Sequence, residues 1–264
     1  MIRRRQWMGA VGAAAVVAIG GGAHAQVADL ADAINKAGRQ RMLSQRMGKA
    51  YLALVQGVET QLAQQVLDKS MALFDRQLVE LKSFARSGDL RGTYVALEAA
   101  WSDYKTTLVG SAPSRAGAAP VLAGAARVLA LAQAGTVQFE ALSNKPVGKL
   151  VNLAGRQRML SQRMAKSYLA AVLPVDVAAS RQDLASARQE FVAAVEVLRS
   201  APEANSKIKE QLALGDAQWL LFDHALQKTA TAGNLKPLAD VFVASENLLE
   251  VMDHVTGLYA ELKA

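Results

Sequence analysis

Apolar residues recur at spacings of three and four along almost the whole chain. This spacing places apolar side chains on one face of an α-helix, whereas a strand alternates with a period of two. Alanine, leucine, glutamine and valine dominate the composition and prolines are few, which also favours helices. The pattern therefore predicts an all-α protein.

Helix-breaking residues divide this pattern into four segments in each half of the chain. The segments are mostly about 20–30 residues long and their connections are short, as in up-down-up-down four-helix bundles. We therefore expect two tandem four-helix bundles. The expected breaks lie at Gly57, 87–89 and 110–113 in the first half, and at Pro174, 201–202 and 233–234 in the second.

One segment of the chain occurs twice without a change, at residues 37–47 and 154–164 (AGRQRMLSQRM). The same offset of 117 residues relates Asn35 to Asn152 and aligns Phe74 with Phe191. This period is far longer than the roughly 20–50 residues of a solenoid repeat, so it indicates a duplicated domain. The predicted domains are residues 26–143 and 144–264.

The connection between the two predicted domains is short. We expect Asn144 to cap the next helix and Pro146 to lie in the first turn of that helix. Because a four-helix bundle returns the chain to the end where it began, the first helices of the two bundles can lie side by side and parallel. The bundles are expected to pair through these first helices.

Residues 1–25 have the order of an export signal: Arg3, Arg4 and Arg5, then an apolar run, then Ala23-His24-Ala25. We expect cleavage after Ala25 and a periplasmic protein. The Arg4-Arg5 pair resembles a twin-arginine signal, and the general and twin-arginine routes both remain open. A membrane span needs ~20 apolar residues, and no later stretch of this length is expected to lack charged residues. Stable membrane insertion is therefore not expected after cleavage.

The charge and residue usage exclude several function classes. The formal net charge of +7 includes three arginines of the expected signal, and basic residues elsewhere are scattered among few aromatics, which argues against nucleic-acid binding. The chain has no cysteine, so thiol catalysis is excluded. Beyond the signal only His224 and His254 remain, and we interpret Asp253 beside His254 as a solvated polar pair. We expect no enzyme activity, metal site or cofactor.

Each predicted first helix carries an arginine on an otherwise apolar face. In the first repeat this face holds Gly38, Arg41 and Gln45. An arginine keeps its charge, and burying it without a partner costs several kcal/mol. No acid lies on this face, so two arginines that met between the paired helices would bind a small planar oxyanion. The alternative is that these arginines reach acids on other helices or extend to solvent. The equivalent residues of the second repeat are Gly155, Arg158 and Gln162.

Other residues of the duplicated segment flank this face. Surface salt bridges are the favoured interpretation of four further arginines, with steering of an anion as the alternative. The methionines are interpreted as core residues rather than as ligands of a soft metal. The arginines are Arg39, Arg46, Arg156 and Arg163, and the methionines are Met42, Met47, Met159 and Met164.

The string INKAGRQRMLSQRM at residues 34–47 resembles the opening helix of the PilJ-type sensor domain of type IV pilus chemotaxis transducers. It is also similar to the periplasmic domain of nitrate and nitrite sensor kinases, which bind nitrate at a dimer interface. The resemblance implies that Gly38, Arg41, Gly155 and Arg158 lie closest to a ligand. It also implies that one chain supplies both halves of the site. The expected supporting residues are Lys36, Gln45, Arg46, Gln162 and Arg163.

The chain departs from the sensor kinases in several respects. In the second repeat, Leu153 lies at the position equivalent to Lys36. Gln40 and Leu43, like their counterparts Gln157 and Leu160, follow the pilus-transducer version of the motif. No kinase or methyl-accepting region is found. We therefore expect an exported sensor-like protein that binds a nitrate-type or nitrite-type anion and signals through a periplasmic or inner-membrane protein. The alternative is a ligand-free module that docks a periplasmic sensor or a pilus or chemotaxis component.

Overall fold

The computed structural model describes residues 27–86, 88–230 and 234–262. The predicted export signal lies outside these residues. The described chain contains eight helices of 21 to 29 residues, which confirms the all-α prediction. They are α1 (Leu30–Val55), α2 (Thr60–Phe84), α3 (Gly88–Val109), α4 (Arg115–Ser143), α5 (Pro146–Val172), α6 (Val177–Ser200), α7 (Ser206–Leu226) and α8 (Lys236–Ala260).

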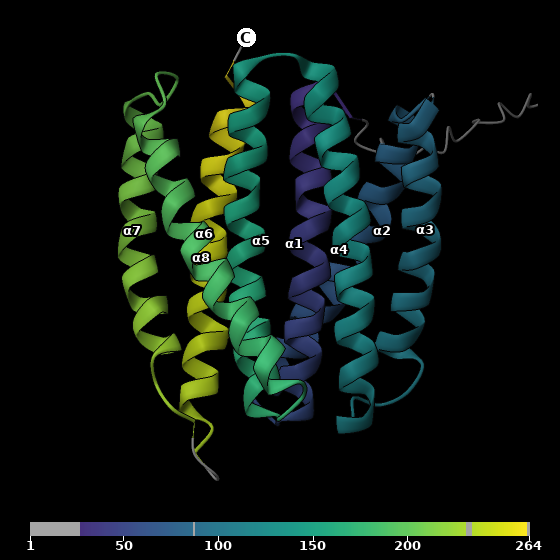
Figure 1. Cartoon of the computed structure of the whole chain (residues 1–264), viewed down its shortest axis with the longest axis vertical. Coiled ribbons are helices and arrows are strands. Elements are labelled where there is room, and N and C mark those ends of the chain that lie inside the picture. The colour runs from purple at the N-terminus through teal and green to yellow at the C-terminus, as the bar shows by residue number, and fades with distance from the viewer. Residues whose placement is uncertain (1–26, 87, 231–233, 263–264) are drawn as a thin grey trace, which may run out of the picture.

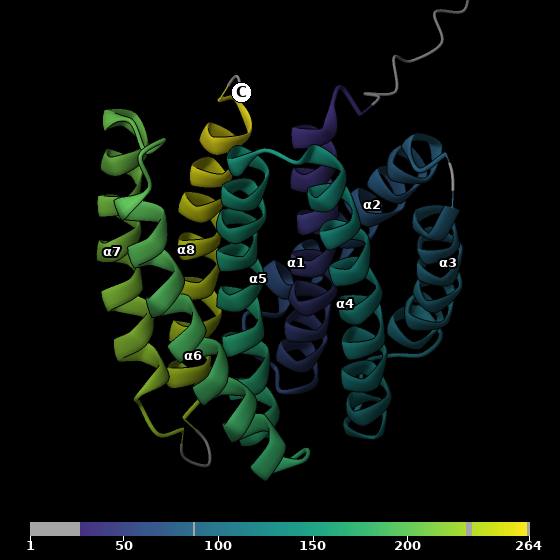
Figure 2. The ribbon, with the colours of Figure 1, turned by 45° about the horizontal axis from the view of Figure 1, so that its top comes forward.

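The eight helices form two four-helix bundles, α1 to α4 and α5 to α8 (Figure 1). Within the bundles, α1 packs against α2 and α4, and α5 packs against α6 and α8. The bundles meet mainly where α1 lies beside α5 (Figure 2). The connection between α4 and α5 lies at the end of the molecule where α1 begins, so α1 and α5 run parallel (Figure 1). The predicted pairing of the first helices is confirmed.

Aromatic residues of the two repeats occupy equivalent places. Phe74 of α2 lies 4.2 Å from Trp101 of α3, between ring centroids. Phe191 of α6 lies 4.5 Å from Trp219 of α7 in the same way. Each pair joins the second and third helices of its bundle, so the duplication extends through these helices. The four methionines of the duplicated segments are at most 4 % exposed, as predicted for core residues.

The connector between the bundles differs from the sequence prediction in one residue. Pro146 begins α5, as expected. Asn144, however, does not cap α5: it ends α4 in the left-handed conformation with φ of 45°, and Lys145 is the N-cap residue. Asparagine tolerates this conformation better than most residues do, which suits it to the C-terminal end of a helix. The two residues between α4 and α5 therefore turn the chain sharply.

Helix α4 is a long apolar stretch that Arg127 divides, so no ~20 consecutive residues of it lack charge, as expected. By length and composition α4 would suffice, with a mean hydropathy of 1.3 over its most apolar window. Leucine and valine supply more of this hydropathy than alanine does, and the many small alanine side chains allow close helix packing. In the folded chain α4 packs against α1 and α3 as part of the first bundle.

Candidate functional site

The parallel packing of α1 and α5 brings Arg41 and Arg158 together at the centre of the molecule. Both side chains are fully buried. Arg41 Nη2 donates to the carbonyl oxygen of Asn152 on α5 at 3.2 Å. Arg158 Nη2 donates to the carbonyl oxygen of Asn35 on α1 at 3.1 Å. Because Asn35 and Asn152 are equivalent in the two repeats, the two bonds are related by the pseudo-symmetry of the duplication.

Gly38 and Gly155 provide the space in which the two guanidinium groups meet. A Cβ atom on Gly38 would lie 3.1 Å from Arg41 Nη2 and 3.4 Å from Arg158 Nη2. A Cβ atom on Gly155 would lie 3.1 Å from Arg158 Nη2 and 3.5 Å from Arg41 Nη2. Both Nη2 atoms are thus packed against both glycines, and any larger residue would crowd them. The four residues expected to lie nearest a ligand form one cluster.

The partners of the two arginines differ in charge. Arg158 Nη1 donates to the carboxylate of Asp253 on α8, which also accepts from Arg39 Nη2 at 2.7 Å. Arg41 Nη1 donates to the neutral amide oxygen of Gln133 on α4 at 2.5 Å. The same Gln133 oxygen accepts from Arg156 Nη1 at 3.4 Å. The cluster therefore has a carboxylate in one half and an amide at the equivalent place in the other.

Burial and repulsion from neighbouring arginines act on both guanidinium groups: Arg156 and Arg158 repel Arg41, and Arg39 repels Arg158. Burial, followed by repulsion from Arg156 and Arg158, lowers the pKa of Arg41 to about 9. Burial also lowers the pKa of Arg158 to about 10, although attraction to Asp253 opposes this shift. Burial alone would raise the pKa of Asp253, but attraction to Arg158 and Arg39 lowers it to about 2. Both arginines are thus cationic at neutral pH, and the carboxylate is ionised.

The Nε atoms of both arginines are buried donors without an acceptor in the described chain. An unsatisfied buried donor costs about 1–3 kcal/mol. Gln45 and Gln162 are also buried, one helical turn after Arg41 and Arg158, respectively. Their amide groups donate to the carbonyl oxygens of Ala125 and Ser245, respectively. These two glutamines fix the fourth helices, α4 and α8, against the paired first helices.

The remaining predicted supporting residues lie apart from the arginine pair. Lys36 forms ion pairs with Asp32 and with Glu80 of α2, each at 2.9 Å. Lys36 therefore tethers α1 to α2 within the first bundle. Neither of these ion pairs involves the two central guanidinium groups.

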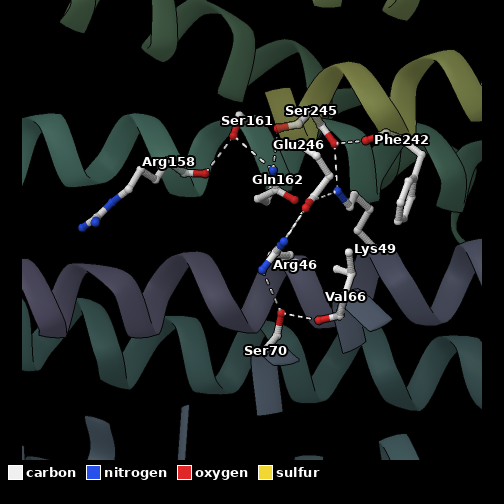
Figure 3. Close-up of polar contacts among 10 residues, drawn as sticks. All are labelled: Arg46, Lys49, Val66, Ser70, Arg158, Ser161, Gln162, Phe242, Ser245 and Glu246. Atoms are coloured by element: carbon white, nitrogen blue, oxygen red, sulfur yellow. Dashed lines mark hydrogen bonds and ion pairs between the residues drawn. The ribbon is translucent and has the colours of Figure 1, made fainter. Parts of the chain in front are cut away.

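The flanking arginines form ion pairs, as expected, but these pairs are partly buried rather than on the surface. Arg46 of α1 binds the carboxylate of Glu246 on α8, which also accepts from Lys49 Nζ at 2.6 Å. Figure 3 shows both cations directed at this one carboxylate. Lys49 Nζ also donates to Ser245 Oγ at 2.8 Å. These contacts join α1 of the first bundle to α8 of the second. The other ion pairs are Arg39–Asp253, Arg156–Glu190 and Arg163–Asp183.

Asp253 and Gln133 are the site residues that sequence reasoning missed. The interpretation of Asp253 as a solvated polar pair with His254 is wrong, because its carboxylate binds two arginines. An acid on another helix was one alternative partner expected for the central arginines, and Asp253 of α8 is such a partner of Arg158. The register that relates these two residues is visible only in the packing of the fourth helices. Gln45 and Gln162 bond to Ala125 and Ser245, which are 120 residues apart, and Gln133 and Asp253 share this offset.

The fold and the cluster define a tandem helical-bundle module with paired cations at its internal interface. The sequence profile of one family, described as the type IV pili methyl-accepting chemotaxis transducer N-terminal domain (PilJ), matches residues 23–134 and 142–242. The chain belongs to this family and carries two copies of its domain. The family is a sensor domain rather than a catalytic one. No curated protein and no solved structure matches the chain.

Proposed function

We propose that the protein is an exported sensor that binds a small oxyanion of the nitrate or nitrite type between its two bundles. The observation that carries the proposal is the incomplete neutralisation of the central cluster. Arg41 is fully buried and donates to no carboxylate among the described residues, since its acceptors are Gln133 and a backbone carbonyl. Its Nε atom and that of Arg158 are unused donors in the described chain. A planar oxyanion offers several acceptors and one negative charge.

Binding would be coupled to the relative position of the bundles. Because both guanidinium groups are buried between α1 and α5, an entering anion must separate these helices and then hold both arginines. A ligand shifts a conformational equilibrium only when it binds one arrangement more tightly than another. Charge repulsion between Arg41 and Arg158 in the empty site provides that difference. A periplasmic or inner-membrane signalling protein would read the change.

The sharpest test changes Gln133 to glutamate. Gln133→Glu has almost the same shape as the parent residue and would give Arg41 the carboxylate that Arg158 already has. Gln65→Glu, at an exposed position of α2, is the matched control. The exported protein is titrated with nitrate, nitrite, sulfate and chloride at equal ionic strength, and the melting temperature is measured.

We expect nitrate or nitrite to raise the melting temperature of the parent and of Gln65→Glu, but not that of Gln133→Glu or Arg41→Gln. The Gln133→Glu protein should melt higher than the parent without any anion. A parent that responds to no oxyanion would overturn the proposal and favour the alternative, a ligand-free module that docks another protein. The Asp253–Arg158 ion pair is the observation that favours this alternative.

A further inference from the structure

The pseudo-symmetry of the two bundles relates two buried lysines, Lys49 of α1 and Lys166 of α5. They are 117 residues apart, the offset of the duplicated segments. Lys49 is fully buried and Lys166 is 8 % exposed. A buried ammonium group requires a close acceptor, because removing it from water is costly. The surroundings of these two lysines can therefore be compared residue by residue.

Lys49 has a complete set of partners from α8. Its Nζ atom lies 2.6 Å from a carboxylate oxygen of Glu246 and 2.8 Å from Ser245 Oγ. It also lies 4.2 Å from the centroid of the Phe242 ring. Figure 3 shows the ammonium group of Lys49 beside Ser245 and Glu246. Glu246 thus neutralises a cation that belongs to the other bundle.

The equivalent place beside Lys166 has no carboxylate from α4. The offset of 120 residues between α4 and α8 places Ala126 where Glu246 stands and Leu122 where Phe242 stands. Within the described residues, Lys166 forms no hydrogen bond and no ion pair. The nearby carboxylate of Asp183 is already used, since its oxygens accept from Arg163 Nε at 2.8 Å and from Ser167 Oγ at 2.7 Å.

A cavity of about 260 Å³ occupies the space beside Lys166. It lies between α4, α5 and α6, and its wall combines the lysine with apolar side chains of α4. Burial lowers the pKa of Lys166 to about 8, against the attraction of Asp183, so the group is still mainly cationic at neutral pH. The lining includes Lys166, Ala126, Leu122, Leu129, the exposed Asp176 and the ion pair of Asp183 with Arg163.

We propose that this cavity binds a small monocarboxylate, whose carboxylate pairs with Lys166 as Glu246 pairs with Lys49. The space left by Ala126 admits the ligand, and Leu122 and Leu129 would contact a short hydrocarbon chain. The exposed Asp176 also lines the cavity and would repel a second carboxylate. This site is separate from the arginine cluster and does not depend on oxyanion binding there.

The test restores the missing carboxylate within the chain. Ala126→Glu places glutamate at the position equivalent to Glu246, and Ala123→Glu adds the same group elsewhere on the exposed face of α4 as a control. Butyrate and succinate are titrated into the exported protein by calorimetry and in thermal-shift measurements, with sodium chloride at equal ionic strength as the reference. Lys166→Met removes the proposed cation, and Gln133→Glu separates this site from the arginine cluster.

We expect butyrate to bind the parent, Ala123→Glu and Gln133→Glu, with succinate weaker than butyrate. Binding should be lost in Ala126→Glu and Lys166→Met. Ala126→Glu alone should melt about 2 °C or more above Ala123→Glu, because it supplies the partner of Lys166. The proposal is overturned if the parent binds no butyrate, or if Ala126→Glu and Lys166→Met bind it as the parent does. Equal melting temperatures of the two glutamate variants would also contradict it.

Discussion

Gln133 contacts Arg41 at the place where Asp253 contacts Arg158. The two acceptors lie on equivalent turns of α4 and α8, and each also contacts a second arginine. The difference of one charged oxygen makes the two halves of a nearly symmetric site unequal. The first-helix segments alone, which are identical, could not produce this inequality.

Asp253→Asn should destabilise the protein. The substitution leaves the buried Arg158 without a carboxylate, and breaking a buried ion pair typically costs 3–5 kcal/mol. Since the Asp253 side chain is 42 % exposed, we expect a smaller loss of about 2 kcal/mol in the free energy of unfolding. Urea denaturation measures this loss. Asp103→Asn, which removes an exposed carboxylate 3.5 Å from Arg127, should change the stability by less than about 0.5 kcal/mol.

Gly38→Ala and Gly92→Ala should change the stability in opposite directions. Alanine is favoured over glycine within a helix by roughly 1 kcal/mol, and a Cβ atom on Gly92 would meet nothing within 4 Å. On Gly38 the Cβ atom would lie 3.1 Å from Arg41 Nη2, which is held by its bond to Asn152. We expect Gly92→Ala to gain about 0.5–1 kcal/mol and Gly38→Ala to lose about 1 kcal/mol, measured by urea denaturation. A stabilised Gly38→Ala would show that the guanidinium groups move freely.

The helices and the central arginines were predictable from the sequence because both depend on local patterns. Periodic apolar residues and helix breakers define α1 to α8, and identical segments place Arg41 and Arg158 at equivalent positions of paired helices. Asp253 and Gln133 were not predictable by the same reasoning. They lie on α8 and α4, where the repeats share little sequence and the offset has changed from 117 to 120 residues. Only the packing of the fourth helices reveals them.

Some local signals admit more than one structure. Asn144 beside Pro146 suits the start of a helix, but it also suits the left-handed end of the helix before it, and the structure has the second arrangement. The apolar composition of α4 would fit a membrane span as well as a bundle helix. Tertiary contacts with α1 and α3 decide between the two.

Acidification should remove the stability that Glu246 provides. Burial alone would raise the pKa of this carboxyl group, but Lys49 and Arg46 lower it from 4.5 to about 2. A carboxyl group with a lowered folded-state pKa stabilises the fold above its unfolded-state value, and this contribution is lost as the pH falls from about 4.5 to about 2. The parent should therefore lose about 2–3 kcal/mol more than Glu246→Gln across this window. Urea denaturation at a series of pH values tests the difference, and parallel curves for the two proteins would contradict it.

Lys166→Met should stabilise the ligand-free protein at neutral pH, whereas Lys49→Met should destabilise it. Lys166 is a buried cation with no hydrogen-bonded acceptor among the described residues, and replacing such a group by an apolar side chain of similar size removes a cost of about 1 kcal/mol or more. Lys49→Met instead removes two hydrogen bonds and part of the neutralisation of Glu246. Urea denaturation of both variants in buffer without carboxylates measures the contrast.

Lys166→Met should also change how the stability of the protein depends on pH. Because the folded-state pKa of Lys166 is about 8 and its ordinary value is 10.5, the unfolded chain binds more protons between these values. The stability of the parent should therefore rise relative to Lys166→Met as the pH increases from 8 to 10.5. If the difference between the two proteins stays constant across this range, Lys166 is not buried as a cation.

The connector of Asn144 and Lys145 has a consequence for how the protein works at low abundance. When paired sensor helices belong to separate subunits, dilution separates them and abolishes the site between them. Here two residues of the same chain join the two bundles, so the local concentration of one bundle around the other is constant. A single chain therefore contains a complete pair of first helices, and this pairing does not depend on the protein concentration.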